Sequence, residues 1–236
     1  NGVEAATLVD SGFTGVWNVF EGDRNFFRSF GTDAQPEELL DGLGSRHEVM
    51  LANIKKYCVG SPIQAAADAL ANIMERNEVG AAQVERVVVT LPVGGARIVN
   101  DRHMPDINLQ YILSVILLDG HLSFAAAHDV GRMQDPAVLD LRGRIELRAD
   151  DALITPESPR QAIVEVVTGG GERHREHVIK VRGTMENPMT TEEVEQKARD
   201  LLIPSLGEAR TERLITAVAE LESLGSVREL RPLLQR

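Results

Sequence analysis

The sequence is poor in cysteine, in aromatic side chains and in long apolar runs. Cys58 is the only cysteine in the 236 residues, so no disulfide can form within the chain. A chain of this kind suits a reducing cytoplasm. The longest apolar run, 111–118, is interrupted by Ser114 and is far shorter than the ~20 residues that span a bilayer. We therefore expect a cytoplasmic protein with no membrane partner.

Cations are also in the minority. The chain has 25 lysine and arginine residues against 36 aspartate and glutamate residues, a formal net charge of -11. Neutralising phosphates needs an excess of cations, so we expect no nucleic-acid partner. The sequence has no P-loop, no dinucleotide-binding fingerprint and no G-x-S-x-G motif. It begins at Asn1 without methionine or a signal peptide, and we expect a trimmed chain or part of a longer one.

Apolar patterning divides the chain into three segments. Residues 1–54 are predicted to be helix and loop, with a short helix at 3–10 and an aromatic helix at 26–30 that we expect to pack in a core. Residues 55–188 mix α and β patterns. Residues 189–236 are predicted to be helical. The predicted fold class is α+β.

The middle segment carries four predicted strands. Alternating or β-branched residues mark them at 84–91, 144–148, 161–168 and 178–182. Three glycines at 169–171 predict a hairpin turn, and Pro105-Asp106 precedes a predicted helix at 107–118. A Ser61-Pro62 pair predicts another helix start. This order of elements favours a mainly antiparallel sheet with helices on one face.

The last segment contains two sequence signatures of a helix start. Thr190 with Glu193, and Ser205 with Glu208, have the spacing of capping boxes. Pro204 and Gly207 separate two apolar stripes and predict a break between two helices. We expect these helices to pack through leucine-rich stripes.

One histidine pair has the spacing to be considered as a metal site. His174 and His177 lie three residues apart beside the glycine turn. A zinc site needs more ligands, and no second pair is nearby in the sequence. We therefore interpret both as residues of a solvated turn and predict no metal site.

The first cluster that can carry chemistry is Lys55-Lys56-Tyr57, which precedes a predicted helix start. Neighbouring positive charges lower the pKa of a lysine, and a helix N-terminus favours an anion. The position suits a carboxylate substrate or a proton-transferring lysine. The alternative is a pair of solvated surface lysines, which the residues alone favour.

The second cluster runs from Arg102 to Tyr111. Arg102 and His103 have side chains that can bind or protonate a carboxylate. Tyr111 falls in an apolar helix, where a tyrosine is either a core residue with one hydroxyl bond or a hydrogen-bond donor to a ligand.

Both clusters, in this order, resemble segments of the MmgE/PrpD family, which includes 2-methylcitrate dehydratase, cis-aconitate decarboxylase and iminodisuccinate epimerase. The matching segments are NGVEAATLVDSGFTG with FEGDRNFFRSF, IKKYCVGSPIQAAADAL, DRHMPDINLQYILSVILLDG and GTMENPMTTEEVEQKARDLL. The third segment is the closest, with its LQY and LLDG in register. Four segments in order make the resemblance extensive.

The resemblance implies an organisation for the chain. Residues 1–54 would be the tail of an all-helical domain, 55–188 a smaller α+β domain, and 189–236 helices that return to the helical domain. The chain would be the C-terminal half of a family member. We accordingly expect either a homodimer or association with the missing N-terminal half, and no cofactor.

The resemblance also implies roles for residues. Lys55 corresponds to the family's catalytic lysine and Tyr111 to its catalytic tyrosine. From the two clusters themselves, Lys56, Arg102 and His103 are candidate substrate-binding residues. Two positions depart from the pattern, since Gly60 stands where some members have histidine and Cys58 where proline is usual. These departures leave the exact reaction open.

The implied chemistry is proton abstraction next to a carboxylate. We expect part of a lyase, a hydro-lyase like 2-methylcitrate dehydratase, that acts on a small di- or tricarboxylate. The alternatives are an epimerase, an isomerase or a decarboxylase of a related acid, and a non-catalytic fragment or subunit that needs a partner half.

Overall fold

The computed structural model describes residues 1–156 and 158–235. The chain divides into two compact units, Asn1–Met50 and Leu51–Arg236. No helix of the described residues is long and apolar enough to cross a membrane.

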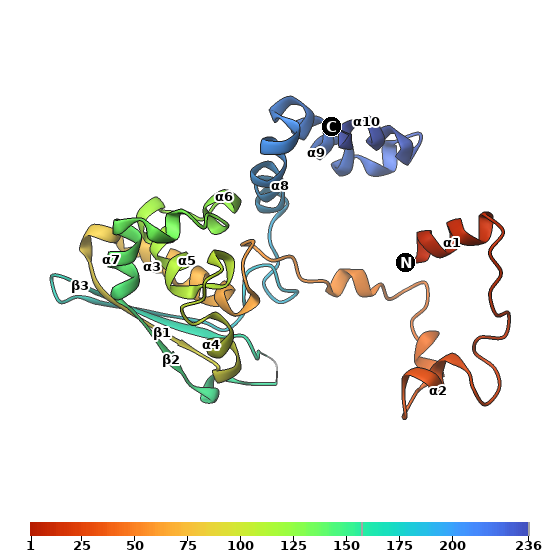
Figure 1. Ribbon diagram of the computed structural model, residues 1–236, viewed down its shortest axis with the longest axis horizontal. Coiled ribbons are helices and arrows are strands. Elements are labelled where there is room, and N and C mark those ends of the chain that lie inside the picture. The colour runs from red at the N-terminus through yellow and green to blue at the C-terminus, as the bar shows by residue number, and fades with distance from the viewer. Residues whose placement is uncertain (157, 236) are drawn as a thin grey trace. The chain divides into compact units, whose positions relative to one another are not determined.

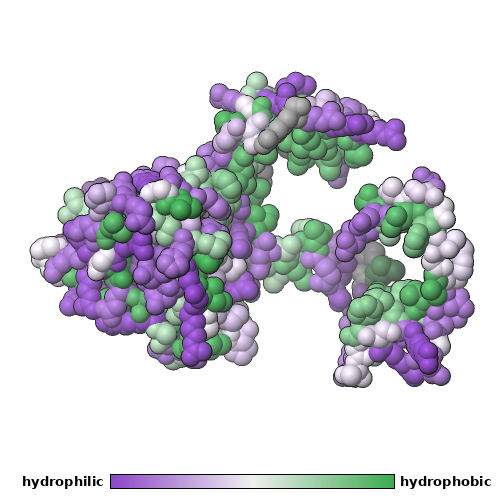
Figure 2. Space-filling view, viewed as in Figure 1, coloured by the Kyte–Doolittle hydropathy of each residue, from purple (hydrophilic) through white to green (hydrophobic). Residues whose placement is uncertain are grey.

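The first unit contains the helices α1 (Gly2–Asp10) and α2 (Phe26–Phe30). Both predicted helices are therefore present. The expected burial of the aromatic helix is wrong: none of residues 1–50 is buried, and Phe26 and Phe30 are 45% and 81% exposed. The aromatic rings pack on one another instead, with Phe20 stacked on Phe27 at 5.2 Å between ring centroids. Apolar side chains consequently lie on the surface of this unit (Figure 2).

The second unit is built on a four-stranded sheet (Figure 1). Its strands are β1 (Val84–Leu91), β2 (Ile145–Ala149), β3 (Ala162–Thr168) and β4 (Arg173–Val178), in the order β2-β1-β3-β4. β1 pairs antiparallel with β3, and β3 with β4, whereas β1 and β2 are parallel. The sheet is thus mixed, because a helical crossover separates β1 from β2.

One predicted strand was misplaced. Residues 178–182 were expected to form the last strand, but β4 ends at Val178 and occupies the residues directly after the glycine turn. The predicted hairpin at 169–171 is confirmed, since Thr168 and Glu172 close it by a backbone hydrogen bond. A tight turn favours immediate pairing of the chain that follows, so the strand begins earlier than its apolar pattern indicated.

The core lies between one face of the sheet and the helices that cover it. Every second residue of β3 is buried, which places Val164 and Val166 on the covered face. Helix α3 (Gln64–Asn77) packs against β3 and β4, and α5 (Leu109–Asp119) packs against α3. All residues of α5 from Leu109 to Leu117 are buried. A helix that is apolar all round is a core helix.

Shorter elements complete the unit. They are the helices α4 (Val93–Val99), α6 (Phe124–Ala127), α7 (Pro136–Gly143) and α10 (Arg231–Leu234), and short 3-10 helices at Ser61–Ile63 and Pro105–Ile107 among others. The helix expected to start at Ser61 therefore opens with a 3-10 turn, and α3 begins at Gln64.

Two longer helices follow the sheet, α8 (Thr191–Leu206) and α9 (Glu208–Ala219). The capping box of Thr190 and Glu193 is confirmed. The second predicted box, Ser205 with Glu208, is wrong because α8 continues through Pro204 to Leu206. The chain turns at Gly207, whose φ of +76° is one that glycine adopts readily.

Candidate functional site

The lysine segment, residues 54–60, is held by hydrogen bonds to three separate parts of the second unit. The Ile54 N–H donates to the Gly183 carbonyl at 2.8 Å, and the Gly60 N–H donates to the Asp106 carbonyl at 2.8 Å. Between them, the Gln64 side-chain amide donates to the Tyr57 carbonyl at 2.8 Å. The segment is therefore a fixed element that joins both sequence clusters.

Gly183 makes one of these contacts, and it is the glycine that opens the GTMENP segment. Its φ is +93°, and a Cβ there would lie 1.8 Å from the Ile54 carbonyl oxygen. Backbone conformation and contact distance both require glycine.

The two neighbouring lysines have different surroundings. The Lys56 ammonium lies 3.4 Å from an Asp68 carboxylate oxygen and 5.0 Å from the centre of the Tyr57 ring. The Lys55 ammonium donates to the Val59 carbonyl at 3.2 Å, and it has no carboxylate partner in the part of the chain that the structure describes. Of the two neighbouring lysines, only Lys55 has no ion-pair partner among the described residues.

The electrostatics of Lys56 differ from the expectation. Burial by itself lowers the pKa of Lys56, but interactions with Tyr57 and Asp68 outweigh it, so the pKa is raised. Burial raises the pKa of Asp68, and its hydrogen bond from the Arg182 N–H and its attraction to Lys56 offset this only in part. Lys56 is thus a charged lysine in an ion pair, and the predicted lowering of its pKa by its neighbour is wrong for this residue.

Asp68 also connects the lysine segment to helix α8. Its second carboxylate oxygen accepts a hydrogen bond from the Arg182 N–H at 3.0 Å. The Arg182 guanidinium in turn binds Glu193 on α8, with Nε 3.1 Å from each carboxylate oxygen and Nη2 in a further contact. The chain of contacts runs from Lys56 through Asp68 and Arg182 to the first turn of α8.

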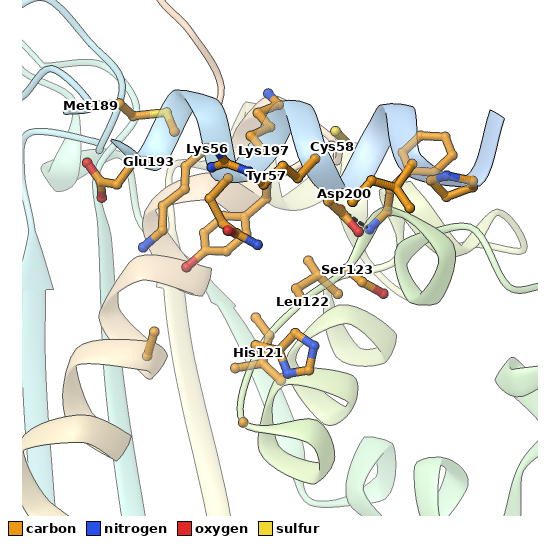
Figure 3. A pocket seen from close by; sticks show the side chains of 18 residues that line it. Lys56, Tyr57, Cys58, His121, Leu122, Ser123, Met189, Glu193, Lys197 and Asp200 are labelled. Atoms are coloured by element: carbon orange, nitrogen blue, oxygen red, sulfur yellow. Dashed lines mark hydrogen bonds between the residues drawn. The ribbon is translucent and has the colours of Figure 1, made fainter. Parts of the chain in front are cut away.

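Four cavities open around these residues in the described part of the chain, and two of them are lined by both Tyr57 and Lys197. The larger, about 640 Å³, lies between α8 and the loop at 121–124. In Figure 3, Lys56, Tyr57 and Lys197 lie on its α8 side and His121 lies opposite. The smaller, about 370 Å³, is lined by both charged and apolar groups: Lys55, Tyr57, Cys58, Val59, Gly60, Asp106, Ile107 and Lys197.

The structure does not bring Arg102 or His103 into either cavity. The Arg102 guanidinium donates to the Ile98 carbonyl at 2.7 Å and to the Arg97 carbonyl at 2.5 Å, so it caps the end of α4. His103 is exposed. Their assignment to substrate binding stays a prediction.

Tyr111 is fully buried in α5. Its hydroxyl donates to the Ala126 carbonyl at 2.6 Å and lies 3.2 Å from the Asp129 carbonyl. Burial raises the pKa of this hydroxyl. These are the surroundings of a core tyrosine, and Tyr111 lines neither cavity. Its catalytic role stays a prediction.

The histidine pair provides no metal site. In β4, His174 and His177 are three residues apart, so they point to opposite faces of the sheet. The His177 Nε2 pairs with the Gln161 side chain at 2.8 Å. Among residues 1–156 and 158–235, no group of three or more histidine, cysteine or acidic side chains could hold a metal ion.

Sequence reasoning missed four residues that shape the site: Asp68, Arg182, Glu193 and Lys197. Asp68 had a readable signal, because it is a single acidic residue within the apolar run 65–70 of α3. A charge in such a position needs a partner. The other three lie more than a hundred residues from the lysine segment, where spacing carries no information about contact.

Comparison with known families gives one match. The model of the MmgE/PrpD C-terminal domain matches residues 57–223. The chain belongs to the MmgE/PrpD family. The match spans the sheet, helices α3 to α9 and most residues of the two cavities. A search of curated proteins finds no match to the chain. MmgE/PrpD proteins are generally enzymes of the dehydratase or lyase type, which places the chain in an enzyme family.

Proposed function

We propose that this chain is part of a hydro-lyase, like 2-methylcitrate dehydratase, that acts on a small di- or tricarboxylate by proton abstraction next to a carboxylate. One observation carries the proposal. Lys55 lines the smaller cavity with no carboxylate partner among the described residues, while its neighbour Lys56 is paired with Asp68. Of these two neighbouring lysines, Lys55 is therefore the one whose charge remains available to an incoming anion.

This arrangement fits the chemistry of a carbon acid. Removing a proton next to a carboxylate places negative charge on that carboxylate, and a fixed cation stabilises the charge as it develops. Gly183 and Asp106 hold the backbone on either side of Lys55, and the Lys55 ammonium donates to the Val59 carbonyl at 3.2 Å. We assign Lys55 the role of carboxylate clamp or acid. The catalytic role of Tyr111 is retained as a hypothesis from the family resemblance, and the substrate-binding roles of Lys56, Arg102 and His103 as hypotheses from the chemistry of their side chains.

The proposal also includes the organisation of the whole protein. We infer from the family match that residues 1–54 continue an all-helical domain, 55–188 form the smaller domain and 189–236 return to the helical domain. A cytoplasmic, cofactor-independent homodimer is part of the same proposal. Light scattering of the full-length protein tests its oligomeric state, and a monomer at working concentration would contradict the dimer.

The reaction itself is tested by incubating the full-length protein with a panel of di- and tricarboxylates in D₂O. Proton NMR then reports deuterium uptake at the carbon next to each carboxylate and the formation of an alkene product. Loss of water with alkene formation supports the hydro-lyase. Deuterium uptake without loss of a group would favour an epimerase instead of the hydro-lyase. If no acid in the panel shows deuterium uptake or alkene formation, carbon-acid chemistry at this site is contradicted.

A further inference from the structure

Lys197 is a second lysine of the smaller cavity, and it comes from helix α8. Its ammonium donates to the backbone carbonyl of Lys55, and both side chains line the same space. Across the described residues, Lys197 has no carboxylate within ion-pair distance. An ammonium has three donors, so two remain after the bond to a neutral carbonyl.

Lys197 is held in place on both sides along α8. One turn before it, Glu193 binds the Arg182 guanidinium. One turn after it, Asp200 accepts a hydrogen bond from the Phe124 N–H at 2.7 Å, which Figure 3 shows as a dashed line. The helix is thus anchored to two different loops within about one turn of Lys197, and the side chain is partly buried. It is a positioned cation rather than a loose surface lysine.

The charges of the smaller cavity do not cancel. Lys55 and Lys197 contribute two positive charges and Asp106 one negative charge. Asp106 forms no ion pair with either lysine among the described residues, and a substrate with a single carboxylate can pair with Lys55 alone. A second carboxylate on the same substrate would find an unpaired ammonium in the same cavity, supplied by α8.

We infer that Lys197 is a substrate-binding residue that selects acids with two or more carboxylates over acids with one. This inference rests on the proposed function and deepens it, because it assigns the second carboxylate of the substrate to a named group. The competing explanation is that Lys197 only ties α8 to the lysine segment through the Lys55 carbonyl.

The test uses the full-length protein and unreactive probes. Tricarballylate has three carboxylates and no leaving group, and butyrate has one carboxylate. Titration calorimetry measures the binding of tricarballylate, and NMR titration measures the weaker binding of butyrate. Lys197→Met keeps the apolar stem and removes the charge, Lys197→Arg restores the charge, and Arg173→Gln removes an exposed cation of β4 that lines neither cavity.

We expect Lys197→Met to weaken tricarballylate binding by about 10- to 100-fold, the worth of a hydrogen bond to a charged group. Butyrate binding should stay within a factor of about two, and Lys197→Arg should recover most of the loss. Arg173→Gln should behave as wild type. A merely structural role would weaken both probes equally, and that result, or no change for tricarballylate, would overturn the inference.

Lys55→Met separates this inference from the proposed function, because it should weaken both probes. If Lys55→Met weakens both and Lys197→Met weakens neither, the proposed site stands and the role of Lys197 is wrong. If the wild-type protein binds neither probe, the proposed function and the role of Lys197 fail together.

Discussion

Glu193→Gln tests whether the contact chain that begins at Lys56 fixes helix α8. Glutamine keeps the capping box with Thr190, because glutamine serves at this position as glutamate does. The substitution therefore removes mainly the ion pair with Arg182. That pair is made through both carboxylate oxygens, and the side chains are 28% and 34% exposed.

The magnitude follows from this partial exposure. Hydrogen bonds to charged groups contribute about 1.5–3 kcal/mol when buried, whereas exposed ion pairs contribute about 0–1 kcal/mol. For a pair that is about one third exposed we expect about 1–1.5 kcal/mol. Since 1.4 kcal/mol is a factor of ten, the local opening of α8 should become roughly 5- to 12-fold more frequent.

Amide hydrogen exchange of the full-length protein measures this opening residue by residue along α8, with β1 as the internal reference. The matched control is Glu192→Gln, which removes a neighbouring carboxylate from the same helix turn. Both substitutions remove the same favourable interaction with the helix N-terminus, and only Glu193 binds Arg182. Equal exchange rates in the two variants would refute the reasoning.

Three further predictions follow from single contacts. Gly183→Ala should lower the melting temperature strongly, because a side chain at this positive φ costs about 1–2 kcal/mol and the new Cβ would collide with the Ile54 backbone. Gly169→Ala is the control: its new Cβ would have no atom within 4 Å, so the melting temperature should change little. Tyr111→Phe should cost about 1 kcal/mol in urea unfolding through the lost bond to Ala126, and a fall in kcat of a fully folded variant would instead favour its catalytic assignment. Arg182 holds the pKa of Glu193 below its ordinary value of 4.5, so this ion pair stabilises α8 fully above about pH 4.5, and the stabilisation is lost as the pH falls through the lowered pKa. The difference in amide exchange between wild type and Glu193→Gln should therefore shrink on acidification. A difference that grows on acidification would contradict this.

Local patterns predicted the elements whose signals are local. Both ends of the strand at 84–91 were predicted correctly, because its β-branched residues lie between Gln83 and Pro92. The helix predicted at 107–118 begins two residues later, since the Asn108 side chain caps it by accepting from the Tyr111 N–H. The ordered similarity of four segments was sufficient to predict the family.

Contacts between distant segments could not be predicted in this way. Parallel pairing of β1 with β2 depends on the path of the crossover, and an alternating strand looks the same in either direction. Lys55 and Lys56 are equivalent in sequence, and only the fold shows that Asp68 pairs with one of them. Lys197 enters the site because α8 packs beside the lysine segment, a contact across 142 positions of the chain.

The kcat/KM of Lys55→Ala in the full-length protein tests the central claim most directly. General acid-base transfer contributes about 10²- to 10⁴-fold, so we predict a loss of at least about 100-fold on whichever di- or tricarboxylate the wild type converts. The fold should be intact, because Lys55 is exposed and its only side-chain bond in the described structure is to the Val59 carbonyl. A well-folded Lys55→Ala variant with unchanged kcat/KM would contradict the account.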